Sequence, residues 1–327
     1  MASAALTAGG IARRSRTRGF LDRLRSGDEV AHLVTLTFAA SILLITVLLV
    51  IELWGSSAQA RHQFGWGFLL GRIWDPVMGE FGALPFIYGT LVTSLLSLLM
   101  ALPVGLGAAI FLSEMAPPRV SDALTFVIEL LAAVPSVIYG LLGIFVLVPL
   151  MRDTVQPALE RTLGFLPLFH GGNYGVGVLT ASVVLAIMIL PFIVSISREA
   201  LLAVPREQRE AALAIGATRW EATWQVVVPF ARLGILGSAF LALARALGET
   251  MAVTMVIGND PRIGPSLFAP GYSIAAIIAN EFTEATADLH LSALVELGLV
   301  LFVLTFVING LARLLILATT RRGTAQS

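Results

Sequence analysis

The sequence predicts an all-α polytopic membrane protein with six transmembrane helices and with both termini in the cytoplasm. Three observations predict this fold class. Apolar residues make up 57% of the 327 residues and charged residues only 13%, whereas an average soluble domain is about one quarter charged. The mean hydropathy is +0.88. Six segments contain the roughly 20 apolar residues that a membrane-spanning helix needs.

The predicted spans begin with a segment that also resembles a signal peptide. The six predicted spans are residues 33–53, 86–112, 123–150, 176–197, 233–257 and 292–317. Ala58-Gln59-Ala60, which comes after the first span, resembles a signal-peptidase cleavage site. Because this span is longer than the apolar core of a signal peptide, we expect it to be retained in the protein. Residues 1–32 are predicted to be a disordered cytoplasmic tail. Because residues 1–20 are rich in Ala, Ser and Arg and lack acids, a transit peptide is the alternative.

Arginine placement predicts the orientation. Cytoplasmic loops of membrane proteins carry an excess of basic residues. With the N-terminus inside, fifteen of the 21 basic residues fall in predicted cytoplasmic segments and five outside, while Arg245 falls within a span. An even number of spans then returns the C-terminus to the cytoplasm.

The chain lacks several residue types that particular chemistries require. It has no cysteine, which excludes disulfides and thiolate chemistry, and all of its basic residues are arginines. Without lysine it cannot form a Walker A motif. Any ATP and Mg²⁺ would therefore be used by another chain, and we expect no cofactor here. His32, His62, His170 and His290 lack metal-ligand spacing, and no catalytic constellation is present.

The second predicted span carries a polar stripe. Thr90, Thr93, Ser94 and Ser97 follow helical spacing and therefore share one face. Hydroxyl residues commonly hold membrane helices together, and they also line translocation pathways. Both interpretations stay open for Thr90 and Ser94. Pro103, Pro135 and Pro191 lie in or near spans, where a lost backbone hydrogen bond is tolerated beside protein or a water-filled cavity.

The cytoplasmic segment 198–232 predicts a helical hairpin. Pro205 suits a first helical position, and good helix formers follow it as far as Gly216, which offers a helix stop. Thr218 and Glu221 have the spacing of a capping box that starts a second helix, which we expect Pro229 to end. Such an element is either a solvated connection or, because its first helix is rich in alanine, a docking surface for another protein.

Five positions in this hairpin resemble the EAA loop of ABC importer permeases. Glu210, Ala211, Ala212, Gly216 and Pro229 match the family pattern in type and spacing. Val226 and Val228 stand where the family has Ile and Leu. The resemblance implies an ABC importer permease (MetI-like) fold over residues 33–322, followed by a short tail at 323–327. It also implies that this hairpin couples the chain to a separate ATPase subunit.

Two further stretches narrow the resemblance to permeases of phosphate-specific importers. They are AAVPSVIYGLLGIFVLVPL at 132–150 and RALGETMAVTMVIGN at 245–259. The resemblance covers roughly residues 86–317. It implies a subunit without catalytic activity of its own, located in the bacterial inner membrane. The implied partners are a second similar permease, a dimer of ATPase subunits and an extracytoplasmic phosphate-binding protein.

Arg245 and Glu249 are the leading candidates for the substrate pathway. On one continuous helix, residues four apart lie on the same face and can form an ion pair. That pair would either simply neutralise the charges for insertion or meet the substrate, since intramembrane charges usually face a bundle interior or a water-filled route. A guanidinium suits phosphate oxygens. We hypothesise that Arg245 meets the anion while Glu249 moderates its affinity.

Two other acids lie in predicted spans. Glu129 is a weaker pathway candidate and would pair with Arg245 or with an arginine of the second permease; a locally neutralised structural acid is equally compatible with its position. Glu296 is expected at the outer interface. Among other functions, a sulfate or molybdate importer permease is the nearest alternative. An ion-coupled carrier or a channel is more remote, because neither needs the projecting hairpin. An intramembrane enzyme would require a paired catalytic group at membrane depth, for which only Arg245, Glu249 and Glu129 are candidates.

Overall fold

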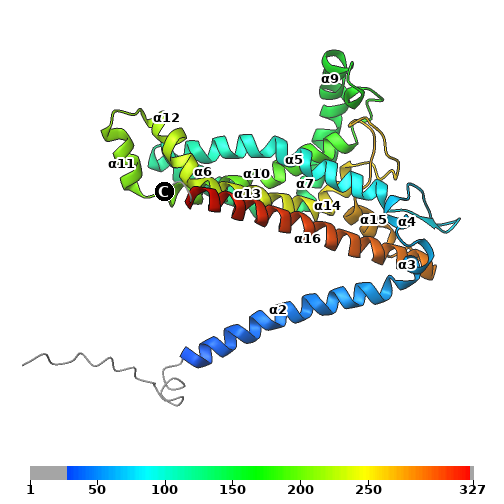
Figure 1. Ribbon diagram of the computed structural model, residues 1–327. Coiled ribbons are helices and arrows are strands. Elements are labelled where there is room, and N and C mark those ends of the chain that lie inside the picture. Colours follow the sequence, from blue (N-terminus) through cyan, green and yellow to red (C-terminus); the bar gives the residue numbers. More distant parts are fainter. Residues whose placement is uncertain (1–27, 325–327) are drawn as a thin grey trace, which may run out of the picture. The chain divides into compact units, whose positions relative to one another are not determined.

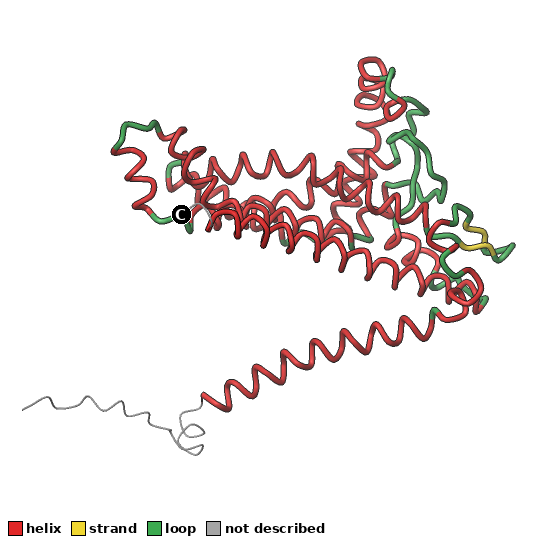
Figure 2. Tube along the Cα trace, viewed as in Figure 1, coloured by secondary structure: helices red, strands yellow, loops and turns green. Residues whose placement is uncertain are grey.

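The structure is a computed structural model that describes residues 28–324. Within this range the chain is almost entirely helical, with one short pair of strands (Figure 2). It divides into two compact units, Met1–Glu52 and Leu53–Ser327. The first unit holds most of helix α2 (Asp28–Ser56), which is apolar around its circumference and begins before the predicted span. The remainder of the predicted tails lies outside the described residues.

The second unit contains the other elements, which are labelled in Figure 1 where there is room. Its α-helices are α3 (Ala58–Phe64), α4 (Gly67–Leu70), α5 (Leu84–Ile110), α6 (Pro118–Ala132), α7 (Ser136–Leu142), α8 (Val148–Leu150), α9 (Gln156–Leu163), α10 (Val178–Leu202), α11 (Arg206–Ala214), α12 (Arg219–Ala222), α13 (Val228–Leu247), α14 (Met251–Val256), α15 (Ile274–Glu281) and α16 (Asp288–Thr324). Its π-helical segments are η1 (Phe111–Met115), η2 (Gly143–Leu147), η3 (Met151–Val155) and η5 (Thr223–Val227), and η4 (Pro167–Phe169) is a 3₁₀ turn. Strands β1 (Trp74–Asp75) and β2 (Glu80–Phe81) form an antiparallel hairpin.

Six helical stretches among the described residues are long and apolar enough to cross a membrane, as predicted. They are Val30–Ser56, Leu84–Met115, Ser136–Leu163, Val178–Leu202, Arg219–Leu247 and Asp288–Leu314. Helices α11 and α12 project at one end of the second unit, and the C-terminal end of α16 lies at that same end, while α9 projects at the other (Figure 1). This arrangement agrees with the predicted cytoplasmic side.

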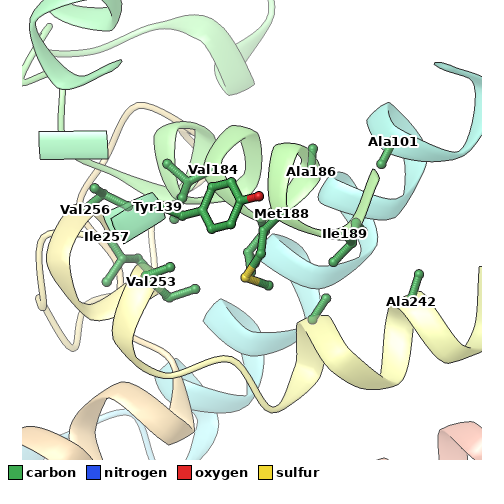
Figure 3. Packing of buried hydrophobic residues seen from close by; sticks show 14 of the residues in the cluster. Ala101, Tyr139, Val184, Ala186, Met188, Ile189, Ala242, Val253, Val256 and Ile257 are labelled. Carbon is green, nitrogen blue, oxygen red and sulfur yellow. The ribbon is translucent and has the colours of Figure 1, made fainter. Parts of the chain in front are cut away.

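Helix α10 is the central helix of the bundle. Two thirds of its most apolar stretch is buried, against one third for α5 and α16. A helix that is apolar all round is stable only when other elements cover it. Its neighbours include α5, α13, α6, α14 and α7. In the core cluster, Tyr139 of α7 lies beside Val184 and Met188 of α10 (Figure 3).

The π-helical segments share one sequence feature. Each ends two residues before a proline, and these prolines are Pro117, Pro149, Pro157 and Pro229. Proline lacks an N–H, and its ring clashes with the carbonyl four residues earlier. Widening the preceding turn relieves that clash, as where the Val228 amide donates to the Thr223 carbonyl instead of the Trp224 carbonyl. The helix therefore runs on from Arg219 to Leu247, and the prediction that Pro229 ends it is wrong.

Two predicted spans are not continuous helices. Residues 123–150 are interrupted after Ala132, where Pro135 takes an extended conformation before α7 begins. Residues 233–257 are interrupted after Leu247. Gly248 is a poor helix former, and the Glu249 carboxylate accepts a hydrogen bond from the Ala252 amide at 3.3 Å, which satisfies a donor in the first turn of α14.

The β-hairpin and α15 form a second cluster at the end opposite α11. Trp74 packs edge-to-face on Phe81 and on Phe86 of α5. Its indole N–H donates to the Glu281 carboxylate at 2.9 Å, and the His290 imidazole contacts the same oxygen at 2.9 Å. Helix α15 is the short helix that we expect within residues 258–291. These contacts hold the loop segments around α15 against α5 and α16.

Gly89 on α5 provides a test of this packing. An added Cβ there would lie 2.9 Å from the carbonyl carbon of Tyr272, whereas at Gly107 on the same helix it would meet nothing. We expect Gly89→Ala to lower stability by about 1–3 kcal/mol through overpacking. Gly107→Ala should be neutral or stabilising by up to about 1 kcal/mol, because alanine favours helix. Thermal unfolding of both variants in detergent measures this, and equal melting temperatures would contradict the close approach.

Candidate functional site

The predicted cytoplasmic hairpin is present as α11 and α12. Pro205 is the residue before the first helical position of α11, one place earlier than expected. Gly216 has a φ of +94°, a left-handed conformation in which glycine is favoured. Thr218 and Glu221 form the predicted capping box: each side chain accepts from the backbone N–H of the other residue, at 3.2 and 2.8 Å.

Arg209 anchors this hairpin to the bundle. Its guanidinium forms two hydrogen bonds to the Glu114 carboxylate, at 2.9 and 3.2 Å. The same group donates to the carbonyls of Leu201 at 2.7 Å and Val204 at 2.5 Å. Both charged side chains are mostly buried, at 20% and 12% exposure. Because it joins α11 to the cytoplasmic ends of α5 and α10, Arg209 makes the hairpin move with the membrane helices.

The hairpin exposes three large apolar side chains among its charged residues. Ile215 is 87% exposed at its tip, and Trp220 and Trp224 are 55% and 44% exposed. The two indole rings pack edge-to-face at 5.6 Å. Exposed apolar groups gathered at a projecting tip are typical of a protein-binding surface. Of the predicted coupling residues, Glu210, Ala211, Gly216 and Pro229 are exposed, and Ala212 is buried against the bundle.

A pocket lies between the hairpin and the bundle. It has a volume of about 240 Å³. Its lining residues are Glu114, Arg209, Leu213, Arg219, Ala222, Thr223 and Val227. The anchoring ion pair thus forms part of its wall.

Arg245 and Glu249 do not form the predicted pair. No ion pair within 4.0 Å joins them in the described part of the chain, because α13 ends between them and Glu249 instead caps α14. The Arg245 guanidinium lies over the Phe192 ring, 4.5 Å from its centroid. Its Nε atom is buried without a hydrogen-bond partner. The structure therefore leaves a donor available at Arg245.

The polar stripe of α5 is buried between helices. Thr90 donates to the Phe86 carbonyl at 2.8 Å and accepts from the Ile274 amide at 2.9 Å, which ties α5 to the start of α15. Ser94 is fully buried, and its hydroxyl has no partner. These contacts favour the helix-packing interpretation of the stripe in this conformation.

Glu129 and Glu296 differ from expectation in their burial: the first is exposed and the second is buried. Glu129 is exposed on α6. Glu296, which we expected at an interface, is 8% exposed on α16, with one carboxylate oxygen lacking a hydrogen bond. Within residues 28–324, no three His, Asp or Glu side chains gather as metal ligands would.

The anchoring role of Arg209 is testable by hydrogen exchange. We expect Arg209→Ala to speed amide exchange over residues 206–214 about tenfold, because losing a mostly buried, bidentate ion pair costs on the order of 1–3 kcal/mol. Arg206→Ala, an exposed arginine on the same helix, is the control and should leave exchange unchanged. Equal protection in both variants would show that the ion pair does not hold α11.

Residues 101–321 match the family model described as "Binding-protein-dependent transport system inner membrane component". The chain is 47% identical to the phosphate transport system permease protein PstC of Mesorhizobium japonicum over 313 residues, covering 94% of this chain and 96% of that protein. It is 47% identical over 286 residues to PstC of Haemophilus influenzae, and the match covers 86% of this chain and 90% of that protein. It is 36% identical over 292 residues to a probable PstC of Methanocaldococcus jannaschii, covering 88% and 92%.

Solved structures with the same fold are ABC transporters. A bacterial alginate ABC transporter in complex with its periplasmic protein matches with a TM-score of 0.56, 16% identity and coverage of 89% of this chain and 96% of that one. An inward-facing MetNI methionine transporter matches with a TM-score of 0.54, 18% identity and coverage of 75% and 99%. At these identities the likeness concerns the fold alone, and it confirms the predicted ABC importer permease architecture. The chain belongs to the family of binding-protein-dependent transport system inner membrane components, and within it to the PstC-type permeases.

Proposed function

We propose that this chain is the permease subunit through which an ATP-driven importer moves inorganic phosphate into the cytoplasm of a bacterium, across the inner membrane. The observation that carries the proposal is the identity of 47% with a phosphate transport permease over 94% of this chain. The projecting hairpin with an exposed apolar tip supports it independently, because a channel or ion-coupled carrier does not need a docking surface of this kind.

The proposed complex contains three further kinds of subunit. A second, PstA-type permease forms the pathway together with this chain, a dimer of PstB-type ATPases drives it, and a PstS-type phosphate-binding protein delivers the substrate from outside. ATP and Mg²⁺ bind to the ATPase, since a chain without lysine has no Walker A motif. This chain is then a transport subunit that catalyses no reaction itself.

Motion passes from the ATPase into the membrane along one continuous helix. The hairpin seats on the ATPase through Ile215 and the two exposed tryptophans. From Arg219 the helix runs without a break to Leu247, so Arg245 lies about 40 Å from the docking surface at the helical rise per residue. A stiff helix of this length transmits a displacement of the hairpin to the interruption after Leu247, close to Arg245. Arg209 makes the ends of α5 and α10 move together with the hairpin.

Arg245 is proposed to meet the anion on its way through. Phosphate carries a large part of its charge into the pathway and loses hydration there, and a guanidinium fork replaces lost hydrogen bonds. The buried Nε of Arg245 has no partner, and Glu249 is held away from it by the cap on α14. Although Glu249 forms no ion pair with Arg245 among the described residues, its negative charge weakens the attraction of the site for the anion, so that the anion is also released.

Substitution of Arg245 tests this step. In proteoliposomes that contain the complete complex and ATP, we expect Arg245→Gln to reduce phosphate uptake at least tenfold, because the only charge of α13 at this depth is lost. Arg245→Lys should retain part of the activity. Arg232→Gln, an exposed arginine nearer the cytoplasmic end of the same helix, is the matched control. Normal uptake by an assembled Arg245→Gln complex would reject the pathway role.

Docking of the ATPase is tested at the hairpin tip. We expect Ile215→Asp to reduce copurification of the ATPase at least tenfold, since it places a charge in an apolar contact without disturbing a folded core. Phe165→Asp changes a similarly exposed apolar residue, 78% exposed, near α9 at the opposite end and should have no effect. Undiminished ATPase recovery with Ile215→Asp would contradict the docking surface.

The anion itself is tested by competition. Unlabelled phosphate should suppress uptake of labelled phosphate by the reconstituted complex, while a tenfold excess of sulfate or molybdate should leave it unchanged. Sulfate that competes as well as phosphate would favour the sulfate-type importer instead.

A further inference from the structure

Glu129 is an exposed carboxylate at membrane depth. It lies on α6, which begins at the cytoplasmic end of the bundle: the Ser121 hydroxyl donates to the Leu112 carbonyl at 2.8 Å, and Arg198 approaches the same hydroxyl at 3.5 Å. From there α6 runs back along α10, and Ile128 packs against the apolar cluster that contains Val194 and Leu201 of α10.

Glu129 follows Ser121 by eight residues, which is about 12 Å along α6 at the helical rise per residue. Because α6 runs back along α10, Glu129 lies deeper than Arg198, the residue beside Ser121, by about this distance. The hydrocarbon core of a bilayer is about 30 Å thick. Arg245 lies at a similar level, because its guanidinium stacks on Phe192 of α10.

The surface around Glu129 is otherwise apolar. Phe126 and Leu130 are 60% and 53% exposed, and Val127 and Leu131 are 49% and 45% exposed. Asp122 is also exposed and shares the face of Glu129, two turns closer to the cytoplasm. Among the described residues, no basic side chain forms an ion pair with Glu129 within 4.0 Å, so residues 28–324 supply no counter-charge.

Neither lipid nor a water-filled route suits this surface. A carboxylate facing hydrocarbon at this depth is costly, and intramembrane acids almost always face protein or water and pair with a cation. A water-lined route, however, would not be walled by phenylalanine, valine and leucine. An apolar surface with one central charge fits a protein interface, in which the partner buries the apolar groups and supplies the opposite charge.

We propose that this face of α6, comprising Asp122, Phe126, Glu129 and Leu130, is the surface on which the second permease packs, and that Glu129 pairs there with a basic side chain of that permease. The inference rests on the proposed function, because it requires a second permease in the complex. It adds the location of the contact and the charge that the partner contributes.

Photo-crosslinking in the assembled complex tests the location. A photoreactive benzoyl-phenylalanine replaces Phe126, and in a separate variant Phe306, which is 72% exposed on α16. The Phe126 position should crosslink to the second permease, identified by mass spectrometry, at least tenfold more than the Phe306 position. The proposal is overturned if Phe306 crosslinks to that permease and Phe126 does not.

Charge changes at Glu129 test the pairing. Glu129→Arg should lower recovery of the second permease with this chain at least tenfold, and Glu129→Gln should lower it less, because repulsion adds to the loss of the pair. Leu124→Gln is the control, because Leu124 is 41% exposed on the opposite side of α6, and its change should leave recovery of the second permease unchanged. Equal recovery with Glu129→Arg and with wild type would overturn the pairing.

Accessibility separates a protein interface from a water-filled route. The chain has no cysteine, so Glu129→Cys introduces a single thiol. In the assembled complex a membrane-impermeant thiol reagent should label it at least tenfold more slowly than Gln208→Cys on α11. Equal labelling would place Glu129 in water. If wild-type complexes import phosphate while these tests fail, only the interface is wrong; if no second permease copurifies with wild type, the proposed function fails.

Discussion

The ion pair between Arg209 and Glu114 is the interaction on which the proposed coupling to an ATPase depends. It joins residues that are 95 positions apart in the sequence. A short helix such as α11 is unstable by itself in water. The pair, together with the two carbonyls that Arg209 also binds, fixes α11 to the ends of α5 and α10. Without this attachment, movement of the proposed ATPase against the hairpin would bend the loop between the helices and would not displace the membrane helices.

Prolines in or near the membrane helices impose a second constraint. Lipid cannot satisfy backbone groups that a proline leaves without partners. The chain resolves this by a π turn before Pro229, so that the hairpin and the fifth span remain one mechanical element. The helix instead ends at Gly248, directly after the turn that carries Arg245. The continuous helix therefore ends where the proposed substrate contact begins. Glu129 of α6 lies at a comparable depth, within the surface assigned to the second permease.

The sequence predicted those features that depend on local chemistry or on long apolar runs. The six spans, the capping box of Thr218 and Glu221 and the turn at Gly216 belong to this group. It did not predict the break after Leu247, because the apolar pattern continues through it and only the capping contact of Glu249 reveals it. It also assigned Pro229 as a helix end, because a proline usually ends or kinks a helix, and here a π turn before the proline lets the helix continue. The partner of Arg209 was missed because spacing contains no information about contacts between distant segments.

In the proposed function, this chain opens and closes a pathway for phosphate only when a separate ATPase subunit drives it. The most direct test of this function is phosphate flux into proteoliposomes that contain either the purified chain alone or the complete complex. Phosphate flux is expected only when the second permease, the ATPase, the binding protein and ATP are all present. Sustained phosphate flux through the purified single chain, in the absence of ATP, would contradict it.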